Sequence, residues 1–224
     1  MLYGARPTKT SLAFFLGLAS GIMSGVVIWD LIPSAVKYGS LLSVLCGIGL
    51  GIITLNFLDR ILNALIRAPA GMSLEKTSKA ELKRLGLLIA FGIALHDFPE
   101  GIAIAAGFSA SENLGVLIAL AIALHNIPEG MVAAAPLWMG GMSRRDITAL
   151  IFLIALITPV GVLLGLWLVS ISNELVSLLL AFAGGAMAYI VGKELIREAL
   201  RYGPGISALG AVTGLLVIIF LNSF

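Results

Sequence analysis

Apolar residues fill seven long runs of this sequence, and polar residues gather in the segments between them. Each run approaches or exceeds the roughly 20 residues that a helix needs to cross a bilayer. Lipid offers the backbone no hydrogen-bond partners, so every crossing segment should be helical. We predict an all-α, polytopic transmembrane helix bundle with spans at 11–36, 40–58, 85–108, 114–139, 148–172, 175–197 and 205–223.

Composition agrees with a membrane protein. Hydrophobic residues make up 59% of the 224 residues and charged residues only 12%, against roughly 25% charged residues in soluble domains. We expect one membrane domain over 1–224, with the lipid bilayer as its surroundings. The formal net charge of +2 gives no reason to expect a nucleic-acid partner.

The loop cations are distributed unequally between the two ends of the spans. Twelve lie on the side of the N-terminus, called the basic side below, and Lys37 alone lies on the opposite side. By the positive-inside rule we expect the basic side to be cytoplasmic, with the N-terminus inside and the C-terminus outside. We expect the membrane to be the plasma (inner) membrane. Residues 59–84 form the one long connection, which we interpret as a solvated cytoplasmic loop. The twelve are Arg6, Lys9, Arg60, Arg67, Lys76, Lys79, Lys83, Arg84, Arg144, Arg145, Arg197 and Arg201.

Two internal repeats join spans of opposite direction. IALHDFPEG at 93–101 and IALHNIPEG at 122–130 match at seven of nine positions, at an offset of 29. Residues 16–39 match 180–203 at ten of 24 positions, at an offset of 164. Inverted repeats are typical of secondary transporters, whose substrate site lies near the bilayer midplane. The symmetry also implies an eighth span before residue 1, because 148–172 has no partner in the first half.

Ionisable groups inside the spans mark the candidate site, because such groups cost several kcal/mol unless they are paired or hydrated. The densest cluster lies on the third and fourth spans. In each motif a histidine and a glutamate are four residues apart and share one helix face, and an internal proline frees a backbone carbonyl. The candidate metal ligands are His96, Asp97, Glu100, His125, Asn126 and Glu129.

A metal ion is one explanation of this cluster, and hydrogen bonding between helices is the other. Two copies on adjacent spans favour a ligand set. Imidazole with carboxylate suits zinc and similar first-row ions. Zinc is the favoured substrate, and iron, manganese, cobalt and cadmium are further candidates. Because histidine binds metal only when neutral, uptake should weaken at acid pH.

The paired motifs HDFPEG and HNIPEG resemble those of the ZIP (Zrt/Irt-like) divalent metal transporters, close to their bacterial branch. The resemblance covers nearly the whole chain, including LITPVG at 156–161. It implies an eight-helix importer with its site on the paired motifs. This sequence is expected to depart from the family pattern in two ways. The family's first helix is missing here, and Thr158 stands where many bacterial members have a glutamate that helps to hold a second metal.

Three more acids are candidates for the entrance or exit of a metal route. Asp30 should lie towards the opposite side, whereas Glu194 and Glu198 should lie towards the basic side. The alternative is that all three are solvated acids at helix ends, with Lys193 and Arg197 as partners of the two glutamates.

We predict a transporter of divalent transition-metal ions, which takes them into the cytoplasm, rather than an enzyme. No resident cofactor is expected, and a homodimer is the assembly considered. An intramembrane metalloenzyme of the zinc-hydrolase type is the alternative from another class, but the sequence has no H-E-x-x-H and no serine nucleophile motif. A metal sensor or scaffold would bind metal without flux.

Overall fold

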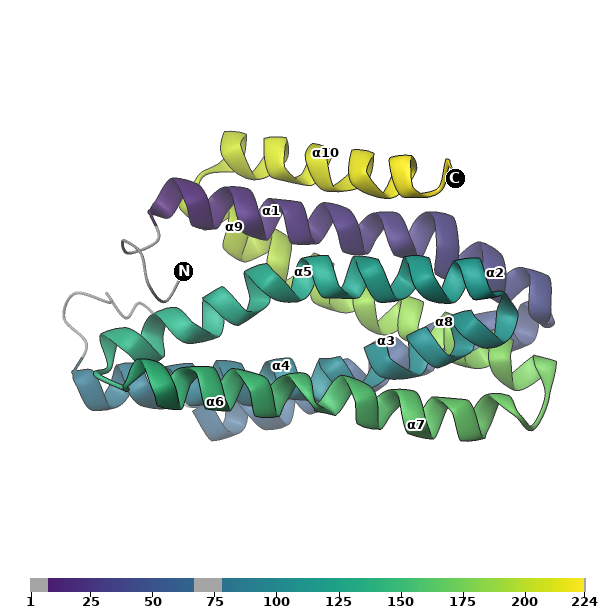
Figure 1. The fold of residues 1–224 in the computed structure, drawn as a ribbon, viewed down its shortest axis with the longest axis horizontal. Coiled ribbons are helices and arrows are strands. Elements are labelled where there is room, and N and C mark those ends of the chain that lie inside the picture. The colour runs from purple at the N-terminus through teal and green to yellow at the C-terminus, as the bar shows by residue number, and fades with distance from the viewer. Residues whose placement is uncertain (1–7, 67–77, 224) are drawn as a thin grey trace.

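The computed structural model of the protein describes residues 8–66 and 78–223. Within these ranges the side chains of Lys9, 62–66, His96 and Glu194 are not described. Seven helices are long and apolar enough to cross a membrane, which confirms the predicted all-α bundle (Figure 1). The elements are α1 (Lys9–Gly25), η1 (Val26–Leu31), α2 (Ile32–Tyr38), α3 (Leu41–Ile66), α4 (Lys79–Ala110), α5 (Glu112–Met139), α6 (Arg144–Ala155), α7 (Ile157–Val169), α8 (Asn173–Ile190), η3 (Val191–Leu195), α9 (Ile196–Tyr202) and α10 (Pro204–Leu221).

Hydroxyl side chains define where several helices begin. Ser111 caps the start of α5 and Ser172 that of α8, and Ser78 forms a capping box with Glu81 at the start of α4. Each cap satisfies a backbone N–H group that has no partner within the helix. Helix α3 reaches Ile66 and α4 begins at Lys79, so the connection is shorter than the predicted loop 59–84.

The inverted repeat is visible in the packing. Helix α1 packs along α10 as α8 packs along α3. Two glycines on α3 and two on α10 allow the backbones of the paired helices to approach closely. The two pairs of glycines correspond at an offset of 163. These matched contacts are Gly47 with Leu178 and Phe182, Gly51 with Phe182 and Ala186, Gly210 with Phe14 and Leu18, and Gly214 with Leu18 and Ile22.

The first and sixth spans also break their α-helical geometry at matching places. Each contains a π-helical segment, η1 or η3, and the two coincide over 27–31 and 191–195 at the offset of 164. Beyond each segment a short helix is tied by a serine hydroxyl. Ser177 Oγ donates to the Ala35 carbonyl at 2.7 Å, and Ser207 Oγ donates to the matching Ala199 carbonyl at 2.6 Å.

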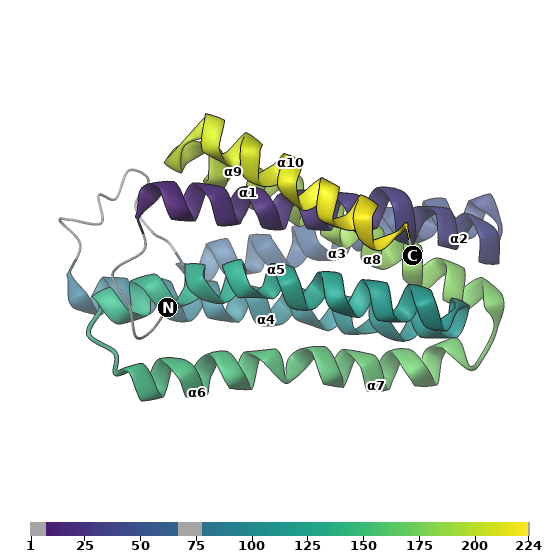
Figure 2. The ribbon, with the colours of Figure 1, turned by 45° about the horizontal axis from the view of Figure 1, so that its top comes forward.

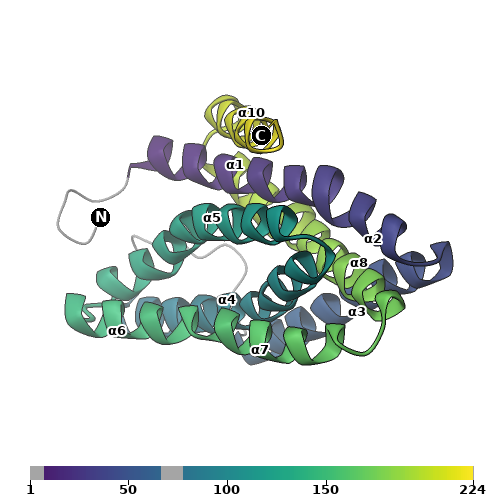
Figure 3. The same cartoon turned by 45° about the vertical axis from the view of Figure 1, so that its right-hand side comes forward.

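The remaining helices form a second group, α4 to α7, called the site group below; the first, second, sixth and seventh spans are called the framework. Figures 2 and 3 show α6 and α7 running end to end along the outside of α4. A Cβ atom at Gly101 would overlap the Thr158 carbonyl, and one at Gly161 would overlap the Phe98 carbonyl. These glycines therefore allow α7 to approach the backbone of α4 directly beside the HDFPEG motif.

Candidate metal centre

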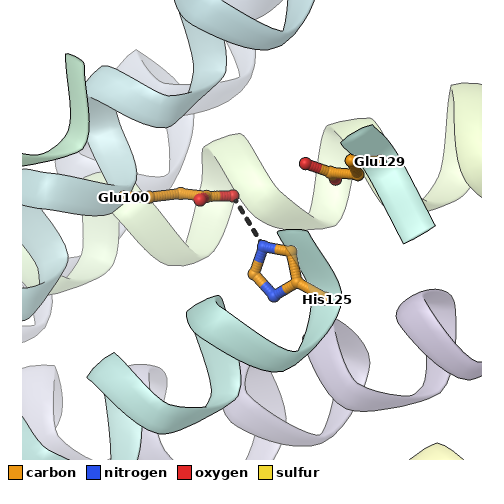
Figure 4. A group of neighbouring side chains, drawn as sticks. All are labelled: Glu100, His125 and Glu129. Carbon is orange, nitrogen blue, oxygen red and sulfur yellow. Dashed lines mark hydrogen bonds and ion pairs between the residues drawn. The ribbon is translucent and has the colours of Figure 1, made fainter. Parts of the chain in front are cut away.

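Three side chains from α4 and α5 converge inside the site group. Glu100, His125 and Glu129 each offer one ligand atom, and these three atoms lie within 4.8 Å of one another. Figure 4 shows both carboxylates turned towards the imidazole ring, with the closest pair being His125 Nε2 and Glu100 Oε1 at 3.0 Å. The exposed fractions are 1% for Glu100, 1% for His125 and 4% for Glu129. The cluster is therefore shielded from solvent and lipid.

The local sequence explains why these side chains meet. His125 and Glu129 are four residues apart, so they occupy one face of α5. Pro99 and Pro128 lie inside helices that continue past them, and α5 bends part-way along its length (Figure 1). A proline in a helix interior removes one backbone hydrogen bond and favours a kink. The sequence thus supplies both the ligands and the bend at one place.

Several buried oxygens in this region have no protein partner. Among the described residues, Glu100 Oε2, Asn126 Oδ1 and Thr158 Oγ1 make no hydrogen bond. Leaving such a group buried and unpaired costs about 1–3 kcal/mol, and more for a charge. A divalent cation satisfies carboxylate and amide oxygens together, and the histidine–carboxylate donor set matches the ligands that zinc takes in proteins.

The other predicted ligands lie beside the cluster. Asp97 is buried, with an exposed fraction of 2%, and Asn126 is half-buried. Both line a cavity of about 50 Å³ with Glu129, between α4, α5 and α6. His96 lies on α4 one residue before Asp97, but its side chain is outside the described part of the chain.

The cavity lies towards the basic side of the cluster. Ile93 and Ala133 line it, and each lies nearer the basic end of its helix than the cluster residues on that helix do. On the opposite side of the cluster the packing is dense, and Ala103, Ile118 and Ala121 are each 0% exposed. The site is therefore densely packed towards the opposite side and bordered by a cavity towards the basic side, where Ala133 and Leu137 are also buried.

The predicted entrance and exit acids have different surroundings. Asp30 lies in η1, is buried, and accepts a hydrogen bond at 3.3 Å from Asn222 Nδ2 on the turn after α10. Glu198 pairs with Arg201 at 3.0 Å, rather than with Arg197 as we considered from the sequence. The backbone of Glu194 lies in η3, and its side chain is outside the described residues.

A polar bridge between α3 and η3 was missed by the sequence analysis. Lys193 Nζ contacts both Asp59 and the Tyr189 hydroxyl, and Tyr189 Oη donates to Asp59 Oδ2 at 3.0 Å. The repeat contained a signal for this bridge. Helices α3 and α10 correspond at an offset of 163, which relates Asp59 to Asn222. Asn222 is the hydrogen-bond donor to Asp30, the acid in the other π-helical segment, η1.

Comparisons with known proteins identify the family of this chain. A family model described as ZIP Zinc transporter matches residues 71–222, which is more than half of the chain. The chain belongs to the ZIP family. It is 35% identical to the zinc transporter ZupT of Chlorobium luteolum over 93% of this chain and 85% of that protein. It is 30% identical to ZupT of Streptococcus mutans over 93% of this chain and 84% of that protein.

A further relative is similar over a shorter stretch. The zinc transporter GufA of Myxococcus xanthus is 42% identical over 52% of this chain and 46% of that protein. The ZIP family model covers both H-x-x-P-E-G motifs and therefore all of the residues that converge in the cluster.

Proposed function

We propose that this chain carries zinc ions across the membrane into the cytoplasm through the centre formed by Glu100, His125 and Glu129. The observation that carries the proposal is the convergence of these three buried ligand atoms within 4.8 Å. The names of the relatives, zinc transporters ZupT and GufA, support zinc as the substrate. Asp97, Asn126 and His96 complete the proposed ligand set from the two motifs.

Charge neutralisation explains how the centre can hold a cation away from water. Two carboxylates balance the charge of Zn²⁺, so the ion and the buried acids offset one another's desolvation. Zinc binds nitrogen and oxygen at about 2.0–2.2 Å, so the cluster contracts slightly around the ion. His125 Nε2 then exchanges its hydrogen bond with Glu100 for the metal, which requires a neutral imidazole.

The surroundings indicate a direction for release. Asp30 is proposed to attract the ion from the opposite side, and the cavity beside Asp97 and Asn126 leads from the centre towards the basic side. Glu194 and Glu198 then receive the ion near the cytoplasm. Dense packing on the opposite side of the cluster prevents return. Alternating access requires a second arrangement, in which the opposite side opens and the basic side closes.

Metal flux into proteoliposomes that hold the purified protein tests the proposal. The parent protein should accumulate zinc with no organic substrate present. The double variant Glu100→Ala with Glu129→Ala should lose more than about 100-fold of the rate, since even residues behind the ligands are worth 10- to 100-fold. Glu112→Ala is the matched control, because it removes an exposed carboxylate from the first turn of α5. A double variant that transports at the parental rate would rule out this centre.

The same assay separates the alternative functions. A sensor or scaffold would bind zinc in the purified state but show no flux. An intramembrane metalloenzyme would need an organic substrate, and the relatives' names as zinc transporters favour transport over that alternative.

A further inference from the structure

A tyrosine at one helix end ties the framework to the site group. Tyr38 is the last residue of α2, and Ala110 is the last residue of α4. The Tyr38 hydroxyl donates to the Ala110 carbonyl. This hydrogen bond joins the framework to the site group. It lies on the opposite side of the molecule, where the packing above the metal centre is closed.

The two internal repeats map this contact onto the basic side. The offset of 164 relates Tyr38 to Tyr202, which is the last residue of α9. The offset of 29 relates Ala110 to Met139, which is the last residue of α5. Two independent sequence offsets therefore lead from one joined pair of helix ends to a second pair of helix ends.

The second pair is not joined in this structure, where Tyr202 is instead hydrogen-bonded to the side chain of Glu198. Among the described residues, no hydrogen bond joins Tyr202 to Met139, and no turn or side-chain hydrogen bond ends on the Met139 carbonyl. The cavity beside the metal centre lies on this same basic side. The joined pair thus stands on the closed side, and the separated pair stands on the side with the cavity.

We propose that Tyr38 and Tyr202 are alternating latches that position the site group in the two states of transport, an inference that rests on the proposed function. In the state open to the opposite side, Tyr38 releases Ala110 and the Tyr202 hydroxyl donates to the Met139 carbonyl. The carbonyls of a last helical turn have no partner within the helix. A tyrosine hydroxyl can therefore satisfy one of them in one state and leave it to water in the other.

A simple capping role would have different consequences. A cap that only stabilises α4 would hold Ala110 in both states, so its loss would lower stability without changing which side is open. A latch contributes to one state only, so its loss changes the ratio of the two states. Removal of one hydrogen bond of ordinary strength should shift that ratio by about fivefold.

Labelling of single cysteines by a membrane-impermeant thiol reagent measures this ratio without any metal. Ala133 lines the cavity, and the offset of 29 relates it to Ile104. The reporters are Ala133→Cys for the basic side and Ile104→Cys for the opposite side. Both are made in a Cys46→Ser background, which removes the protein's one natural cysteine.

Tyr38→Phe and Tyr202→Phe remove only a hydroxyl and serve as controls for each other. Tyr38→Phe should raise labelling of the Ile104→Cys reporter from the opposite side by about fivefold and lower labelling of the Ala133→Cys reporter. Tyr202→Phe should shift the labelling of both reporters in the reverse direction. Labelling after denaturation normalises each sample for the amount of inserted protein.

Two results would overturn the latch proposal. One is labelling in Tyr38→Phe that equals the parental labelling, and the other is a shift in the same direction for both tyrosine variants. A parent protein that shows no zinc flux would instead refute the proposed function. The labelling experiment needs no metal, so its result is independent of the flux result.

Discussion

The two H-x-x-P-E-G motifs share most of their residues but have different neighbours. On α4, Gly101 lies against the backbone of α7, at Thr158 and Gly161. On α5, the matching Gly130 has space around it, and a Cβ atom there would meet only Ile151 Cγ2 at 3.8 Å. Gly130 also lines the cavity, whereas Gly101 is buried.

This difference separates two roles that the motif combines. The residues common to both copies supply the ligands, since a glutamate comes from each and His125 from one. The helix that packs behind a copy decides whether its side of the centre is filled or hollow. Helix α7 fills the space behind the α4 copy, whereas Gly130 faces Ile151 of α6 beside the cavity, without close backbone contact.

The largest expected contrast between the copies is in stability. Gly101→Ala should prevent α7 from packing on α4, because a Cβ atom would overlap backbone that cannot move aside, at a cost of about 3 kcal/mol or more. Gly130→Ala should leave stability unchanged or raise it by up to about 1 kcal/mol through helix propensity. Thermal unfolding of both variants in detergent measures the contrast, and equal losses would show that the two environments are alike.

The next contrast concerns charge beside the ligands. Asp97→Asn removes a buried carboxylate from the cavity wall and should raise the KM for zinc by about three- to tenfold, or up to about 1.4 kcal/mol. Asn126→Asp adds a carboxylate and should lower both KM and the maximal rate, because release becomes slower. The double exchange restores the net charge. If the double variant keeps the weak binding of Asp97→Asn, the two positions are not equivalent and the α4 position is the one that matters.

A smaller effect concerns the number of bound ions. Thr158 offers a neutral hydroxyl beside the centre, and Asn126 offers a neutral amide. Two doubly charged ions about 4 Å apart repel four times as strongly as two unit charges, and bridging carboxylates are needed to offset this. We expect one zinc per chain, rising towards two in Thr158→Glu. Metal analysis of the purified proteins decides this, and two ions in the parent would show that Asp97 or Asn126 already supplies the missing ligand.

The last prediction concerns the orientation of the chain, and its outcome determines which compartment the cavity faces. The tags that test it should leave transport unchanged. A tag inserted between Arg67 and Lys79 should be protected in intact cells, and a tag after Phe224 should be accessible from outside, because twelve cations lie on the basic side. The reverse pattern would turn the cavity towards the exterior and exchange the roles of Asp30 and Glu198.

Much of the site could be predicted from sequence because it depends on local spacing. Glu100, His125 and Glu129 were all among the predicted ligands, and the four-residue spacing of a histidine and a glutamate sets a common helix face without reference to other helices. The partners of the remaining charges could not be predicted in this way. Lys193 contacts Asp59, which is far away in the chain, and Glu198 pairs with Arg201 instead of Arg197.

The sequence by itself determined seven membrane-crossing helices, a basic side and two inverted repeats. These properties follow from hydropathy, charge and residue matches, which are read along the chain without any knowledge of packing. Only the tertiary structure decided which candidate ligands meet, where a cavity borders the centre, and that Tyr38 reaches the Ala110 carbonyl. The physical reason is that helix packing depends on contacts of a few ångströms, such as those of Gly101 with α7.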